Sequence, residues 1–343
     1  MAKSREYWRK RFELLEDAQN HKAMEYSTDL ADAYIESFKK IEKDIATWYQ
    51  RFATNNEITL QEAKRMLKLD ELEEFHWTVE EYIKYGKENA INQAWMKQLE
   101  NASARVHISR LESLQLQLRH HIEELYSAQI KDFENLMKNI YEDQYYQTAF
   151  EIQKAFEVGF TLHALDDDVL AKVISNPWTS DNMTFSARIW RDRNLLIDTL
   201  HTELTQAFAL GEGPQRVISV IQQKMNTSRS NAARLVQTEQ AFFSSSAQKE
   251  TFKELDVEKY EVVATLDSKT SEICQSMDGK VFKMSDYEPG VTANPFHPRC
   301  RTTTAPYFQD DNYGERIARG KDGKVYYIPS NITFKEWKEQ YVA

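Results

Sequence analysis

The stretch ISRLESLQLQLRHHIEELYSAQIKDFENLMKNI, residues 108–140, carries apolar side chains at the three- and four-residue spacing of an α-helix. Charged and amide side chains fill the positions between them, so one face is apolar and the others are polar. The pattern predicts one long helix over about 88–160. Its apolar positions are Ile108, Leu111, Leu114, Leu118, Ile122, Leu125, Ile130, Phe133, Leu136, Met137 and Ile140.

The sequence around this helix is also typical of helices. The first proline is Pro177, and only Gly86 and Gly159 precede it among the glycines, while Glu, Lys, Gln, Leu, Ala and Met are abundant. We therefore predict a helical N-terminal domain or arm over 1–173. Further helical patterns, one of them opened by Pro214, predict a second helical part over 174–256.

The sequence changes character near residue 257. The stretch KYEVVATLD, residues 259–267, is rich in β-branched residues and predicts a strand, and MDGKVFKM, residues 277–284, carries an Asp-Gly turn followed by a second strand. We expect a β-hairpin and a Cys/His turn over 257–310, then a strand and a closing helix over 311–343. The predicted fold class is α+β and predominantly helical, with short antiparallel strands following a long-helix N-terminal half.

Composition excludes several classes of protein. The chain has 343 residues and a formal net charge of −10, which disfavours general binding to nucleic acid. Two cysteines do not form a disulfide framework. No apolar run approaches the roughly 20 residues that span a bilayer, so no membrane contact is expected.

Both cysteines and one histidine point to a metal site. Cys274, His297 and Cys300 have the spacing C-x22-H-x2-C, and its second half matches a zinc-knuckle turn. A structural zinc site has four ligands, so Asp267, Asp278 or water would complete it. Four readings stay open: a structural zinc site, packed residues without a ligand, a Cys274–Cys300 disulfide, and a catalytic Cys/His pair.

A second group of polar residues lies on the predicted helix ARLVQTEQAFF. Arg234 and Glu239 are five residues apart, with Thr238 beside the acid. They form either a buried polar network with an Arg–carboxylate pair or an ordinary solvated helix surface.

Six motifs in this order resemble the phage minor capsid, or head morphogenesis, family that includes the Mu F-like proteins. The resemblance covers about residues 174–343; the N-terminal half is similar only in composition to the helical arm of members from tailed phages of Gram-positive hosts. The motifs are NPWTSDNMTFSARIW, LGEGPQRV, ARLVQTEQAFFSSSAQ, VVATLDSKTSEICQSMDGKVF, NPFHPRCRTTTAPYF and YIPSNITFKEWKEQY.

The resemblance also assigns residues. Family members commonly carry D-x-x-T-C-x-x-C-x-x-x-D-G and H-P-x-C-R-C. Ser271 and Thr302 stand where two family cysteines would be, so only three of the metal ligands remain. The resemblance implies a structural polar network that includes Thr238, Glu239, Asp278, Gly279 and Arg301. The positions that match the two patterns are Asp267, Thr270, Cys274, Asp278, Gly279, His297, Pro298, Cys300 and Arg301.

What the resemblance implies is a virion component assembled in the host cytoplasm and located at the portal vertex or inside the capsid. Its partners would be the portal protein and capsid or scaffold proteins, with transient contact to packaged DNA. We expect no enzymatic activity. The alternatives are a metal-dependent hydrolase or toxin-like enzyme centred on Cys274, His297, Cys300 and Glu239, and a DNA-contacting ejection protein.

Overall fold

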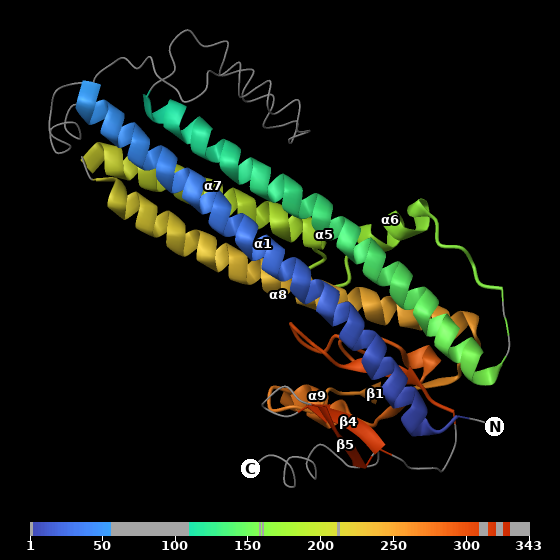
Figure 1. Ribbon diagram of the computed structural model, residues 1–343. Helices are drawn as coiled ribbons and strands as arrows, with labels where there is room; N and C mark the ends of the chain where they lie inside the picture. Colours follow the sequence, from blue (N-terminus) through green and yellow to red (C-terminus); the bar gives the residue numbers. More distant parts are fainter. Residues whose placement is uncertain are drawn as a thin grey trace. The chain divides into compact units, whose positions relative to one another are not determined.

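The computed structural model describes residues 3–55, 110–157, 159, 161–210, 213–308, 315–319 and 325–329. They form two compact units, and each unit is built from separated stretches of the chain (Figure 1). The first unit contains Met1–Ser27, Phe133–Pro177 and Ala233–Ala343, and the second contains Thr28–Asp132 and Trp178–Ala232.

Three long helices contribute residues to both units. They are α1 (Arg5–Asn55), α5 (Arg110–Phe156) and α8 (Pro214–Glu254). The predicted helix over 88–160 is confirmed as α5, and its residues 88–109 lie outside the described part of the chain. Its predicted apolar stripe is buried at Leu114, Leu118, Ile122, Leu125, Phe133, Met137 and Ile140.

The second unit is helical in its described residues. It combines parts of α1, α5 and α8 with α7 (Phe185–Leu210). Buried polar contacts join these helices: Tyr126 donates to Asp192 Oδ2 over 2.6 Å, and the Arg193 guanidinium lies 3.3 Å from Glu123 Oε2. The buried apolar side chains include Leu30, Tyr34, Ile41, Leu118, Ile122, Leu196, Leu200, Leu204, Val217 and Ile221.

The first unit contains the strands. An antiparallel sheet has the order β2-β1-β3, with β1 at Lys259–Val263, β2 at Val281–Lys283 and β3 at Thr303–Pro306. Tyr260 of β1 is paired with Phe282 of β2 and Pro306 of β3. A short helix α9 (Glu272–Met277) and a 3-10 turn η1 (Met284–Asp286) flank β2.

Three more elements complete the described part of this unit. Strands β4 (Glu315–Arg319) and β5 (Val325–Pro329) form a separate antiparallel pair. Helix α6 (Asp167–Ser175) starts at Asp166, whose carboxylate accepts a hydrogen bond from the Val169 amide over 2.8 Å. Such a cap satisfies one of the free amides at the start of a helix.

The core of the first unit brings the chain's N-terminus to the sheet. Trp8 and Phe12 of α1 pack with Phe252 of α8 and with Tyr260 and Val262 of β1. All five side chains are at most 1% exposed. Burial of apolar surface is the main contribution to the stability of a fold. Because these side chains share one buried cluster, the first turns of α1 belong to the same core as the sheet.

The predicted fold class is confirmed: the chain is predominantly helical and carries a small antiparallel sheet in its C-terminal part. The two units differ from the four consecutive segments predicted at 1–173, 174–256, 257–310 and 311–343, because α1, α5 and α8 each extend through both units. The predicted closing helix lies outside the described residues. Among the described helices, none combines the length and apolar character that crossing a membrane requires.

Candidate metal centre

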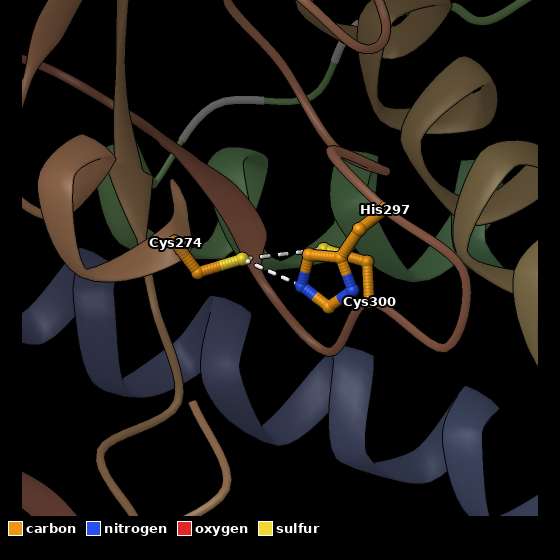
Figure 2. Close-up of side chains that lie close together, drawn as sticks. All are labelled: Cys274, His297 and Cys300. Carbon is orange, nitrogen blue, oxygen red and sulfur yellow. Dashed lines mark hydrogen bonds between the residues drawn. The ribbon is translucent and has the colours of Figure 1, made fainter. Parts of the chain in front are cut away.

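Cys274, His297 and Cys300 lie together in the first unit. Cys274 comes from α9, and the other two come from the loop that precedes β3. Figure 2 shows the Cys274 sulfur directed at both the imidazole ring and the Cys300 sulfur. The Cys274 Sγ lies 3.1 Å from His297 Nε2 and 3.7 Å from Cys300 Sγ, and the ligand atoms of all three residues lie within 4.8 Å of one another.

Local hydrogen bonds place Cys274. Ser271 is the N-cap of α9, and its hydroxyl accepts from the Cys274 amide over 3.3 Å. At the other end of α9, the Asp278 amide donates to the Cys274 carbonyl over 3.0 Å. Because both ends of this six-residue helix are tied, the backbone of Cys274 has a defined position.

The loop from residue 294 to 300 is fixed by contacts to α8. The side chain of Asn294, which is fully buried, donates to the Ala241 carbonyl over 3.3 Å. The Arg299 amide donates to Thr238 Oγ1 over 3.1 Å, and Arg299 has a φ of 62°, in the left-handed region. The Cys300 amide then closes the turn by donating to the His297 carbonyl. These contacts hold His297 and Cys300 on the same side of the turn.

The two thiols have unequal proton affinities. Both cysteines are only 2% exposed. Their mutual hydrogen bond raises the pKa of Cys274 well above its usual value and lowers the pKa of Cys300 to about 7. Thr302, itself 2% exposed, lies beside both sulfurs, and its hydroxyl lowers the pKa of each thiol. Cys300 is therefore the sulfur that loses its proton first.

The spacing of the two sulfurs fits a zinc ion. In a tetrahedral site with Zn–S bonds of about 2.3 Å, the two sulfurs would be about 3.8 Å apart, and here they are 3.7 Å apart. His297 Nδ1 lies 2.8 Å from the Pro298 carbonyl, which can only accept, so Nδ1 carries the proton and Nε2 is free to bind. A backbone partner on the second ring nitrogen is the usual arrangement for a metal-binding histidine.

The predicted fourth ligand, Asp267, is engaged elsewhere. Its two carboxylate oxygens accept from Arg301 over 2.5 and 2.8 Å, and one also accepts from the Lys269 amide. Burial alone would raise the pKa of Asp267, but the Arg301 guanidinium outweighs it and holds that pKa below its usual value. Within the described residues, the close ligand group contains three side chains and Asp267 is not among them.

Thr238 of the predicted polar network contacts the turn that carries His297 and Cys300. Thr238 donates to the Arg234 carbonyl over 2.7 Å in addition to accepting from Arg299. Glu239 is 2% exposed, whereas Arg234 lies on the exposed side of α8. Thr238 therefore has the more direct role, because it connects α8 to the turn that carries His297 and Cys300.

The Asp-Gly pair lies at the start of the sheet. Asp278 Oδ1 accepts from the Ala264 amide over 2.9 Å and from Arg9 Nη2 over 3.0 Å. Gly279 has a φ of +76°, which L side chains rarely adopt, and its carbonyl accepts from Arg5. Both residues thus contact the N-terminal helix.

Sequence reasoning missed the N-terminal residues of this region. Arg5 makes two hydrogen bonds to the Glu261 carboxylate, over 2.7 and 2.9 Å, and Arg9 forms an ion pair with the same group. Nothing in the local pattern of residues 5–9 indicates a partner more than 250 positions away. Arg9 is charged, and its place in the sequence pattern is that of a surface residue. The pattern therefore does not indicate that its side chain is buried, at 1% exposure.

A buried polar seam on α8 was also missed. Gln240 Nε2 and the Ser244 hydroxyl both donate to Glu16 of α1, over 2.7 and 2.6 Å. Ser245 and Gln248 bond to Tyr287 and to Thr304 in the same unit. The run FFSSSAQ, with three consecutive serines inside a helix, was the available signal, since serines are costly in a buried helix unless they are bonded.

Comparison with known proteins finds a family match in this region. Residues 198–305 match the family model described as "Phage Mu protein F like protein". The matched span includes Cys274, His297 and Cys300, and it does not include Arg5 or Arg9. Neither a curated protein nor a solved structure matches the chain.

Proposed function

We propose that this chain is a minor capsid protein of a tailed phage. The reason is that residues 198–305 match a phage Mu F-like family, which acts in phage head morphogenesis. In this proposal the protein lies at the portal vertex, contacts the portal and the capsid or scaffold proteins, and acts in head assembly, DNA packaging or DNA delivery. The observation that carries the proposal is the family match over residues 198–305.

The geometry of the Cys/His cluster supports a structural role. Cys274 and Cys300 are buried, and the apolar side chains of Ala241 of α8, Ala264 and Phe296 pack against them. A catalytic pair needs a nucleophile that its substrate can reach. The cluster instead joins α9, the loop before β3 and α8, which suits a cross-link that gives the module a fixed shape.

We propose that this cross-link holds zinc. Cys274, His297 and Cys300 would be the ligands, with His297 binding through Nε2. A zinc ion in such a site contributes directly to folding, because the ligands converge only in the folded chain. Elemental analysis of the purified chain tests this. We expect close to one zinc per chain, and less than about 0.2 would contradict it, because structural sites hold their metal tightly.

Co-expression with the portal protein of the same phage tests the proposed place in the head. The portal protein carries an affinity tag, and an unrelated protein with the same tag serves as the control bait. We expect the chain to elute with the portal protein and to be enriched over the control. If both proteins are folded and no complex forms, the portal assignment is wrong.

Detection in purified particles separates assembly from delivery. We expect mass spectrometry to find the chain in procapsids. Its presence in mature virions and its loss after DNA release would favour delivery, whereas its retention would favour a fixed role at the vertex. Absence from procapsids and virions alike would contradict the minor capsid proposal.

A further inference from the structure

Two arginines at the N-terminus close a buried ionic network on the sheet. We call it the N-terminal clamp, formed by Arg5 and Arg9 of α1 with Glu261 of β1 and Asp278 after α9. Arg9 and Glu261 are each 1% exposed, and the Asp278 side chain is 4% exposed. Two guanidinium groups face two carboxylates, so the charges balance, which buried ions require.

The clamp reaches the Cys/His cluster through Asp278. The side chain of Asp278 accepts from Arg9 and from the Ala264 amide, and its own amide donates to the Cys274 carbonyl. Ala264 packs in the same buried cluster as both cysteines. Arg9 is therefore two hydrogen bonds away from the backbone of a predicted metal ligand.

We propose that Arg9 and Asp278 are positioning residues for the metal centre, and that the start of α1 acts as a latch on it. This inference rests on the zinc role proposed above. With Arg9 in place, Asp278 holds the end of α9 and so fixes the direction of the Cys274 sulfur. Without Arg9, a buried carboxylate loses a cation, and α9 is free to shift.

The coupling works in both directions. If docking of α1 favours metal binding, then metal binding favours docking of α1 by the same free energy. Zinc should therefore protect the backbone amides of residues 5–15 from hydrogen exchange, although these residues lie outside the family match at 198–305. A head protein that displaced the start of α1 would loosen the metal centre.

The test compares zinc affinities, measured by competition with a chromophoric chelator. Arg9→Gln and Asp278→Asn remove the clamp contact, and Arg11→Gln is the control, because Arg11 is on the same helix but 39% exposed at its side chain. We expect affinity to fall about 10- to 100-fold in the first two variants, the range for partners of metal ligands. The control should stay within about twofold, since the ion pair of Arg11 is with Glu151 of α5, outside the clamp.

A second measurement keeps the proposal testable if Arg9→Gln does not fold. Hydrogen exchange of the unmodified chain, with and without zinc, should show slower exchange at residues 5–15 when zinc is bound. Cys274→Ser should lose this difference. Unchanged exchange in the zinc-loaded chain, or a folded Arg9→Gln variant with undiminished zinc affinity, would overturn the latch and leave the zinc proposal standing. An unmodified chain that binds no zinc would overturn both.

Discussion

The Arg299 amide donates a hydrogen bond to Thr238 Oγ1, and this contact ties the turn carrying two predicted metal ligands to helix α8. Arg299 has a left-handed backbone, so the turn depends on outside contacts to keep its shape. Replacing Thr238 with Val keeps the side-chain shape and removes the acceptor. We expect a loss of about 1 kcal/mol in the free energy of unfolding, at the modest end because Arg299 is exposed.

Thr238→Ser is the matched control for this contact, because it keeps the hydroxyl. Urea denaturation followed by circular dichroism measures both variants. The serine variant should unfold close to the unmodified chain, and the valine variant at lower urea with the same slope. Equal midpoints for Val and Ser would show that the hydroxyl does not hold the turn.

Gly279 has a backbone conformation that other residues adopt only at an energetic cost. Its φ is +76°, and a Cβ added there would meet Arg5 and Arg9 at 3.8 Å, an ordinary contact distance. The cost of Gly279→Ala therefore comes from the backbone and not from a clash, and we expect about 1–2 kcal/mol of destabilisation. Gly159→Ala is the control, since an added Cβ there meets nothing within 4 Å. Thermal unfolding of both variants checks this, and a Gly279→Ala variant as stable as Gly159→Ala would contradict it.

Patterns that act over a few residues predicted much of this fold. The apolar spacing before residue 157 predicted α5, and the Asp-Gly pair at 278–279 predicted the turn before β2. Such signals are readable because the helix and the turn are made by near neighbours in sequence. The Cys/His group was predicted for a similar reason, since few residue types bind metals.

Long-range partners were not predictable in the same way. Asp267 is a suitable metal ligand and an equally suitable partner for Arg301, and only the folded geometry places it against Arg301. The partners of Glu261 come from a helix 256 residues earlier in the chain. No spacing rule links two such segments, so the sequence did not indicate that α1 packs against the sheet.

Glu16 predicts a pH dependence of stability. It is buried with two neutral donors, Gln240 and Ser244, and burial raises its pKa to about 7. In the unfolded chain the proton leaves near pH 4.5, so between about pH 4.5 and 7 the folded state binds more protons. The contribution of Glu16 to stability is therefore complete below pH 4.5 and is lost as the pH rises through 7.

Glu16→Gln removes this titration and keeps a side chain whose oxygen can accept from Gln240 and whose NH2 group can donate to the Ser244 hydroxyl oxygen. At pH 8 we expect the variant to be more stable than the unmodified chain, by up to about 3 kcal/mol. At pH 4.5 the two should differ little. Urea denaturation of both proteins across this pH range measures the difference between their free energies of unfolding. The contributions of the other titrating groups cancel in this difference. A difference that does not change with pH would show that Glu16 titrates normally.

Thr302 offers a direct test of the metal centre. Its side chain lowers the pKa of both cysteines and so lies beside them, at the position where the resemblance described above implies a cysteine. Thr302→Cys would add a third thiol beside Cys274, His297 and Cys300, and so supply four ligands. We expect zinc affinity at least about tenfold higher, because closed four-ligand sites hold zinc most firmly.

Thr302→Ser, which keeps the hydroxyl, should bind zinc like the unmodified chain. The cobalt-substituted Cys variant should also show stronger sulfur-to-metal absorption; unchanged absorption and affinity would mean that residue 302 does not face the metal.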